Sequence, residues 1–95
     1  MSLQKDIYKN FIEAFKAKQE TEASTLRMLH SALKNLAIDK KTDSLDDEAV
    51  LVVIKKELKK RQDSIESFKK AGRNDLAARE EAEAKVLQVY MPAMM

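Results

Sequence analysis

The sequence predicts an all-α fold: a small four-helix domain with a long antiparallel αα-hairpin that turns at Gly72. The 95 residues include one glycine, one proline, three phenylalanines and two tyrosines, so the residues that build turns and strands are scarce. Apolar side chains recur at helical spacing along most of the chain, and the glycine and the proline bracket the last predicted helix. A chain of this length supports one domain, so we expect residues 1–95 to form a single helical unit.

The first predicted helix, residues 2–18, has an unusually wide apolar side. Two adjacent rows make up this side: Leu3, Ile7, Phe11 and Ala14, and then Tyr8, Ile12 and Phe15. Together the rows occupy nearly half of the helix surface, which is more than one packing contact covers. We therefore expect two neighbouring helices to cover it.

A charged loop, DKKTDS, separates the second and third predicted helices. The second helix spans residues 20–38, and its apolar stripe consists of Leu26, Leu29, Leu33, Leu36 and Ala37. The third helix spans residues 45–71, with an apolar face of Val50, Ile54, Leu58, Ile65 and Phe68. Ser44, followed three residues later by Asp47, resembles a capping box and is the predicted cap of the third helix.

The fourth predicted helix lies between the two helix breakers. Gly72 stands where the end of a helix favours a residue that adopts positive φ, and Asn74 is the predicted N-cap of the next helix. Pro92 should end that helix, because proline disfavours the α conformation in the residue before it. Gly72 and Pro92 are thus the predicted hinge and end of the hairpin's second arm.

Each arm of the hairpin carries charge within its apolar stripe. Arg61 precedes Gly72 by the same 11 residues by which Glu83 follows it, and Glu80 lies one helical turn before Glu83. Because equal offsets face each other in an antiparallel hairpin, we predict an ion pair of Arg61 with Glu83 or Glu80 in the seam. The first interpretation is structural, a pair that sets the register of the two helices. The alternative is a site that binds a charged ligand.

Composition excludes several classes of site. The chain has no cysteine, and its one histidine, His30, is expected at the edge of the second helix's stripe. A single glycine excludes the usual Gly-rich phosphate loop. We therefore predict no catalytic residue, no metal site and no cofactor. The start, MSLQKDIYKN, lacks the apolar core of a signal peptide, and no apolar run is long enough to span a membrane, so a cytoplasmic protein is expected.

The strongest candidate for a surface function is a set of basic residues around the segment KKELKKRQ. The net charge of +2 is too small for a protein that is basic throughout, so any RNA contact must come from local clustering. The candidate nucleic-acid-binding residues are Lys55, Lys56, Lys59, Lys60, Lys69, Lys70 and Arg73, with Arg27 and Lys34 beside His30. No aromatic residue is interleaved with the lysines, which favours contact with the backbone of a folded RNA over base stacking. The alternative is an ordinary solvated face whose positive charge is offset by Glu57, Asp63 and Glu66.

Two stretches, STLRMLHSALKNLAIDK and LDDEAVLVVIKKELKKRQDSIESFKKAGRNDLAAREEAEAKVLQVYMP, resemble the YqeY family. That family is related to the C-terminal helical region of the B subunit of the tRNA-dependent Asp/Glu amidotransferase. The resemblance runs from about Ser24 to Pro92 and implies an all-helical domain that ends in a Tyr-X-Pro junction, here Tyr90-Met91-Pro92. A smaller helical tail domain usually follows in the family. Because the chain stops at Met95, we expect that domain to be missing after Pro92.

The resemblance also implies the label of a carbon–nitrogen ligase with glutamine as amide donor. However, the amidase Ser–Ser–Lys machinery resembles nothing here, and the ATP-using site belongs to another part of the B subunit. Our first hypothesis is a non-catalytic accessory module that contacts tRNA or an amidotransferase complex through its basic face. The alternative is a protein–protein or self-association module, suggested by Met28 opposite its helix's stripe and by the apolar tail VYMPAMM. An enzyme that depends on a partner subunit is a third alternative.

Overall fold

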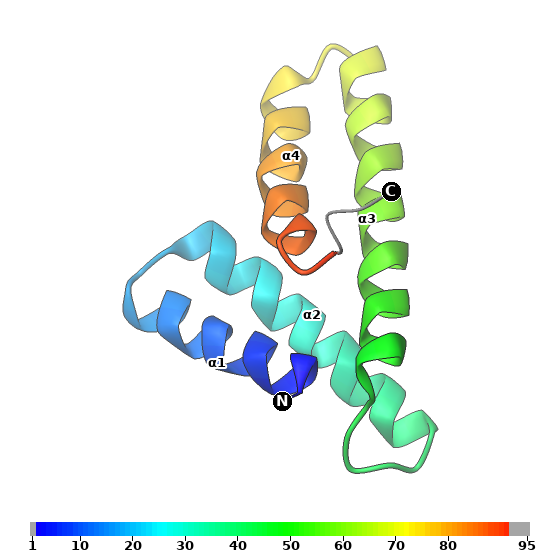
Figure 1. The fold of residues 1–95 in the computed structure, drawn as a ribbon. Coiled ribbons are helices and arrows are strands. Elements are labelled where there is room, and N and C mark those ends of the chain that lie inside the picture. Colours follow the sequence, from blue (N-terminus) through cyan, green and yellow to red (C-terminus); the bar gives the residue numbers. More distant parts are fainter. Residues whose placement is uncertain (1, 92–95) are drawn as a thin grey trace.

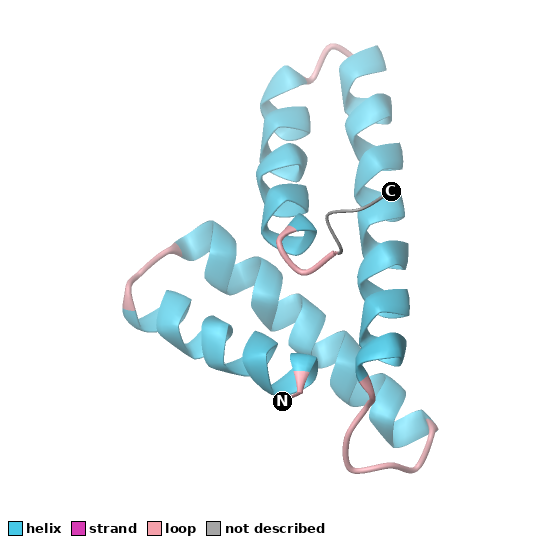
Figure 2. Ribbon diagram, viewed as in Figure 1, coloured by secondary structure: helices cyan, strands magenta, loops and turns pink. Residues whose placement is uncertain are grey.

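The computed structural model describes residues 2–91, which fold into four helices (Figures 1 and 2). Helix α1 spans Leu3–Lys16, α2 spans Glu20–Asp39, α3 spans Asp47–Lys70 and α4 spans Asn74–Gln88. No strand occurs between residues 2 and 91. The predicted all-α fold class is confirmed.

The helices form two antiparallel pairs (Figure 1). Helices α3 and α4 make the long hairpin, and α1 lies along α2. Helix α2 contacts both arms of the hairpin, while the turn between α3 and α4 projects away from the N-terminal pair. The molecule is elongated as a result, with principal extents of 43 × 29 × 27 Å.

The core lies where α2 meets the other three helices. Its buried apolar side chains are Ile7 from α1, Leu26, Leu29, Leu33 and Ala37 from α2, Leu45 from the loop, Val50 and Ile54 from α3, and Leu87 from α4. The predicted stripe of α2 is buried apart from the half-buried Leu36. The hairpin beyond this core is held by contacts between its own two arms.

The turn of the hairpin is a Schellman motif centred on Gly72. Gly72 has φ +75, the Arg73 N–H donates to the Phe68 carbonyl at 2.8 Å, and the Gly72 N–H donates to the Lys69 carbonyl at 3.1 Å. Gly72 therefore takes the positive φ expected of it at the hinge. Helix α4 ends at Gln88, earlier than predicted, and Pro92 lies outside the described residues.

The predicted cap of α3 is wrong. The helix begins at Asp47, and the side chain of Asp46 accepts a hydrogen bond from the Ala49 N–H at 2.8 Å. Ser44 lies two residues before this cap. Leu45, between Ser44 and Asp46, is buried in the core at 5% exposure and belongs to the loop, so the helix begins after it. The predicted capping box therefore does not form.

The predicted cap of α4 is also wrong. Asn74 is the first residue of the helix, and Arg73 holds the N-cap position without a side-chain hydrogen bond to the helix. The Schellman turn places Arg73, one residue earlier than expected, at the junction. Its guanidinium faces the Asp75 carboxylate instead, with Nε 3.4 Å from Oδ1.

The wide apolar side of α1 is only partly covered by its neighbours. Ile7 and Ala14 are buried against the core and Phe11 is half-buried, whereas Tyr8 is 47% and Phe15 is 68% exposed. The two expected neighbours are present, because α1 contacts both α2 and α3, but they leave part of this side uncovered by the described residues. In the second row Ile12 is half-buried, and the exposed surface belongs to Tyr8 and Phe15.

Candidate functional site

The seam of the hairpin contains one arginine and two glutamates. Arg61, only 6% exposed, donates from Nη1 to Oε1 of Glu83 at 2.5 Å, and the same Nη1 lies 3.7 Å from Oε1 of Glu80. The ion pair predicted by counting from Gly72 is therefore present. It is not a bidentate fork: Nε of Arg61 is buried without a hydrogen-bond partner among the described residues.

The electrostatics of this cluster are unbalanced, because one cation faces two carboxylates. Burial raises the pKa of Glu80 above its usual 4.5, the neighbouring Glu83 raises this pKa further, and Arg61 and Arg79 oppose the rise. The charges of Arg61, Glu80 and Glu83 thus interact with one another within the seam. The arrangement supports the structural interpretation, in which the cluster sets the register of α3 and α4. Between residues 2 and 91 no group of three or more His, Cys, Asp or Glu is placed to hold a metal ion.

The basic residues in the middle of α3 lie on its solvent side. We call Lys55, Lys56, Lys59 and Lys60 the α3 basic surface; all four are exposed, on turns whose opposite side carries the buried Ile54 and Arg61. Within the described part of the chain, Lys60 alone of the four has an acidic partner, Glu57, with Nζ 3.7 Å from Oε2. The Lys60 side chain is nevertheless 76% exposed. The structure thus presents four ammonium groups within six residues.

The basic residues near the turn are more strongly compensated. Lys69 Nζ lies 4.0 Å from Oε2 of Glu81 on the facing helix, and Arg73 is paired with Asp75. Lys70 is exposed, but the exposed Asp63 and Glu66 separate this group from the α3 basic surface. The predicted basic face is therefore concentrated in its first half.

Arg27 and Lys34 belong to a different part of the molecule. Both are exposed on α2, one turn to either side of His30, whose ring centroid is 4.7 Å from that of Tyr8 on α1. His30 is half-buried, as expected at the edge of the core stripe. Burial, and then the charge of Lys34, lower the pKa of His30 below 6.5. These two basic residues flank an aromatic contact and do not extend the surface of α3.

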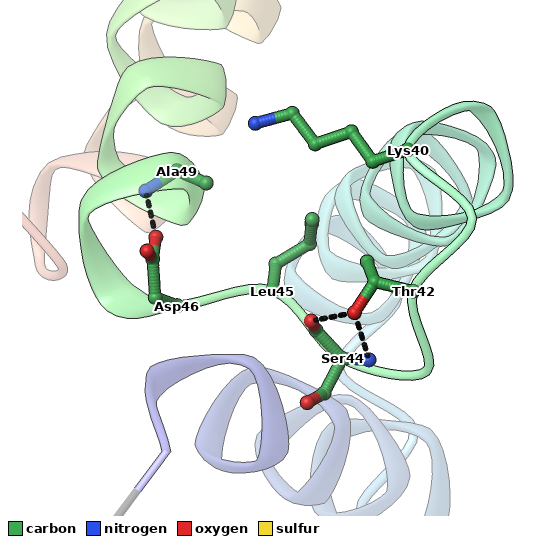
Figure 3. A pocket seen from close by; sticks show the side chains of 6 residues that line it. All are labelled: Lys40, Thr42, Ser44, Leu45, Asp46 and Ala49. Carbon is green, nitrogen blue, oxygen red and sulfur yellow. Dashed lines mark hydrogen bonds between the residues drawn. The ribbon is translucent and has the colours of Figure 1, made fainter.

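Two shallow pockets lie away from the α3 basic surface. The first, of about 280 Å³, is formed at the start of α3 by Lys40, Thr42, Ser44, Leu45, Asp46 and Ala49 (Figure 3). Two of its polar side chains already have structural roles: the Thr42 hydroxyl donates to the Ser44 carbonyl at 2.9 Å, and Asp46 caps α3. We assign no ligand to this pocket. The second, of about 230 Å³, adjoins Phe15 at the turn between α1 and α2.

The tail predicted to be exposed divides into different environments. Val89 is 78% exposed, but Tyr90 and Met91 pack against the core, and residues 92–95 lie outside the described part. Asn10 Nδ2 of α1 donates to the Tyr90 hydroxyl at 2.8 Å, a contact that sequence analysis missed. Met28 is 47% exposed, in agreement with its position opposite the stripe of α2.

Comparison with known proteins identifies relatives over nearly the whole chain. The family described as Yqey-like protein matches residues 4–95. An uncharacterized protein of Schizosaccharomyces pombe is 39% identical over 93 residues, covering 96% of this chain and 73% of its own length. The protein named "Altered inheritance of mitochondria protein 41, mitochondrial" is 37% identical over 82 residues in Eremothecium gossypii, covering 86% of this chain and 45% of that protein. Its counterpart in Lachancea thermotolerans is 38% identical over 90 residues, covering 95% and 46%.

These relatives correct the expected location. The names of the Eremothecium and Lachancea proteins place them in mitochondria, which contradicts the cytoplasmic location expected from the sequence. The composition of a sequence can argue against a secretory signal, but it does not distinguish one aqueous compartment of the cell from another. In residues 2–91 no helix combines the length and the apolar character needed to cross a membrane. The chain spans less than half the length of these two mitochondrial relatives. From its match over residues 4–95 and from these relatives, the chain belongs to the family of YqeY-like proteins.

Proposed function

We propose that this chain is a non-catalytic accessory module of the tRNA-dependent amidotransferase type, which binds the phosphate backbone of a folded RNA such as tRNA. The α3 basic surface is the observation that carries the proposal. Its four lysines are exposed on a rigid helix, and three of them have no acidic partner within 4.0 Å among the described residues. A solvated face whose charges were matched by neighbouring acids would pair more of them.

The geometry of this surface suits phosphates better than bases. Lys55 and Lys60 are separated by about 7.5 Å along the helix axis, so the four ammonium groups form a compact cationic patch. Lysine acts on phosphate as a mobile point charge and carries no base-reading geometry. The exposed apolar residue of this helix is Val52, which offers no ring on which a base could stack. Backbone contact with a folded RNA is the mode that fits.

The arrangement of reactive side chains supports a non-catalytic role. Between residues 2 and 91, the ring of the one histidine contacts that of Tyr8, and the half-buried carboxylates of Glu80 and Glu83 contact Arg61. A nucleophile needs a base within hydrogen-bond reach, and none of the hydrogen bonds among the described side chains joins such a pair.

The test is a titration of a tRNA transcript against the chain at several salt concentrations, followed by fluorescence anisotropy. The logarithm of the affinity should fall linearly with the logarithm of the salt concentration, with a slope of about −0.7 to −0.9 per phosphate contacted. The combined change Lys55→Gln, Lys56→Gln and Lys59→Gln should reduce that slope by about 2 to 3.

The matched control replaces three exposed lysines of α1, Lys5, Lys9 and Lys16, by glutamine. It removes the same charge and should leave most of the affinity in place. Absence of binding at low salt, or an equal loss in the control, would refute the proposal.

Self-association is a second candidate, favoured by the 78% exposure of Val89. Burial of such an apolar side chain between two copies would stabilise a dimer. Sedimentation over a concentration series should then show a heavier species that Val89→Ser removes. A single monomeric species at all concentrations would count against it.

A further inference from the structure

Helix α1 carries a row of aromatic side chains whose outer edge no other described segment covers. We call Tyr8, Phe11 and Phe15 the aromatic row; both successive pairs of ring centroids are 6.3 Å apart. Tyr8 is 47% and Phe15 is 68% exposed. Aromatic side chains have much to gain from burial, because each removes a large apolar area from water. The sequence thus places on α1 an apolar surface wider than residues 2–91 cover.

The two ends of the row are defined by α2 and by the turn before it. At one end the Tyr8 ring lies against the His30 ring, with centroids 4.7 Å apart. At the other end Phe15 borders a pocket of about 230 Å³, which is lined by Ala14, Phe15, Lys18, Gln19, Glu20 and Ala23. A continuous surface therefore runs along α1 from His30 to this pocket.

Basic side chains border the row on both helices. On α2, Arg27 and Lys34 lie one turn to either side of His30, and both are exposed. On α1, the exposed Lys5 and Lys16 share the edge beyond the second apolar row. Glu20, beside the pocket, is the acidic residue among these bordering positions. A partner of complementary charge is therefore acidic.

The geometry of the rings favours a protein partner over RNA. Base stacking needs free ring faces, but His30 lies against Tyr8 and Phe11 is half-buried. The successive rings are also tilted by 48° and 41° to each other, so they form no series of parallel platforms. Apolar side chains spaced one turn apart, with a pocket at one end, are the arrangement into which the apolar side of another helix packs.

We propose that the aromatic row, with Arg27 and Lys34 at its border, is a docking surface for an amphipathic helix of a partner protein that has acidic residues beside its apolar stripe. The partner's apolar residues would lie on Tyr8, Phe11 and Phe15, and one of them would enter the pocket next to Phe15. This surface is separate from the α3 basic surface, so the proposal stands independently of RNA binding.

The experiment uses model helices as probes. One labelled peptide of about 18 residues, long enough to be helical, carries leucines at helical spacing with glutamates beside them. A second peptide has lysine at each glutamate position, and a short oligouridine represents RNA. We expect the acidic helix to bind at least about tenfold more tightly than the basic one, measured by fluorescence anisotropy.

Substitutions locate the contact. Phe15→Ser should weaken binding of the acidic helix by about tenfold or more, because exposed aromatic anchors dominate such interfaces. The matched control is Val52→Ser, which removes an apolar side chain of 51% exposure from α3 and should change the affinity less than about twofold. Arg27→Gln with Lys34→Gln should weaken binding severalfold and flatten its salt dependence, whereas Lys55→Gln with Lys59→Gln should not. Thermal melts check that each variant is folded.

Three results would overturn the proposal. The first is no saturable binding of the acidic helix, and the second is equal binding of the acidic and basic helices. The third is oligouridine binding that Phe15→Ser abolishes while the acidic helix does not compete, which would assign the surface to RNA.

Discussion

One guanidinium nitrogen of Arg61 contacts two carboxylates. The partial exposure of those carboxylates determines how much stability is lost when Arg61 is replaced. Glu83 and Glu80 retain 19% and 21% of their side-chain surface in solvent. After loss of the cation both can regain some hydration. A fully buried carboxylate could not.

We expect Arg61→Met to lower the free energy of unfolding by about 2–3 kcal/mol, less than the roughly 3–5 kcal/mol lost when a fully buried pair is broken. Urea titration followed by circular dichroism measures the change. The control Lys59→Met alters an exposed residue of the same helix and should shift the free energy by less than about 0.5 kcal/mol. Coinciding midpoints for the two variants would contradict the role given to Arg61.

Glu80 makes stability depend on pH in a direction opposite to that of most salt-bridged acids. Burial and Glu83 raise its pKa in the folded state above the usual 4.5. The folded state therefore binds more protons than the unfolded state between 4.5 and the raised pKa, and stability falls as pH rises through that interval.

Glu80→Gln should remove this dependence. Relative to the variant, the wild type should have its highest free energy of unfolding at about pH 4 and should lose that advantage as the pH is raised to neutral. Urea titrations at stepped pH measure the difference between the two proteins. A difference that stays constant across the range, or one that grows with pH, would show that the folded-state pKa is not raised.

At the scale of the element, α3 begins with a cap that can be tested by paired substitutions. Asp46→Ala removes the acceptor of the Ala49 N–H and should cost about 1 kcal/mol. Ser44→Ala should cost less than about 0.5 kcal/mol, because among residues 2–91 the hydrogen bonds of Ser44 are made by its backbone. Thermal and urea unfolding of the two variants measure both effects. A larger loss of stability from Ser44→Ala than from Asp46→Ala would instead identify Ser44 as the cap.

The same helix shows why some of its features follow from the sequence and others do not. Arg61 and Glu83 can be paired by counting, because the register of a hairpin depends only on its turn, and Gly72 marks the turn. The cap cannot be chosen in this way, since Ser44 and Asp46 both offer a suitable oxygen near the start of α3. The choice depends on Leu45, whose burial and whose N–H bond to Gln4 Oε1 at 2.8 Å are tertiary contacts.

Helix α1 shows the complementary case. Its wide apolar side is plain in the sequence, but the pattern does not say what covers Tyr8 and Phe15. Within residues 2–91 their outer edges face solvent. The pattern therefore predicted the apolar surface and its two neighbouring helices correctly, but it overestimated how much of the surface those helices cover. That mismatch is the signal from which a docking surface can be inferred.

At the scale of the whole molecule, polar contacts between distant segments join α1 to the start of α3 and to the residues that follow α4. The Leu3 N–H donates to Asp47 Oδ1 at 2.8 Å across 44 residues of chain, and Asn10 donates to Tyr90 across 80 residues. No local sequence pattern predicts such pairs, because each partner on its own is an ordinary polar or backbone group. They fix how the two helical pairs meet.

Tyr90→Phe should lower the free energy of unfolding by about 0.5–1.5 kcal/mol, since it removes one part-buried hydrogen bond and leaves the packing of the ring in place. The matched control is Tyr8→Phe, which removes a hydroxyl from an exposed ring. It should change stability by less than about 0.5 kcal/mol. Urea unfolding compares the two. Equal effects would mean that the contact between Asn10 and Tyr90 adds nothing to the joint between the two helical pairs.

The bond from Leu3 to Asp47 means that the first turn of α1 and the first turn of α3 close one junction together. A fluorophore or an affinity tag fused just ahead of Leu3 would therefore stand beside the entrance to α3. Its signal would report on the start of α3, although Asp47 lies 44 residues further along the chain.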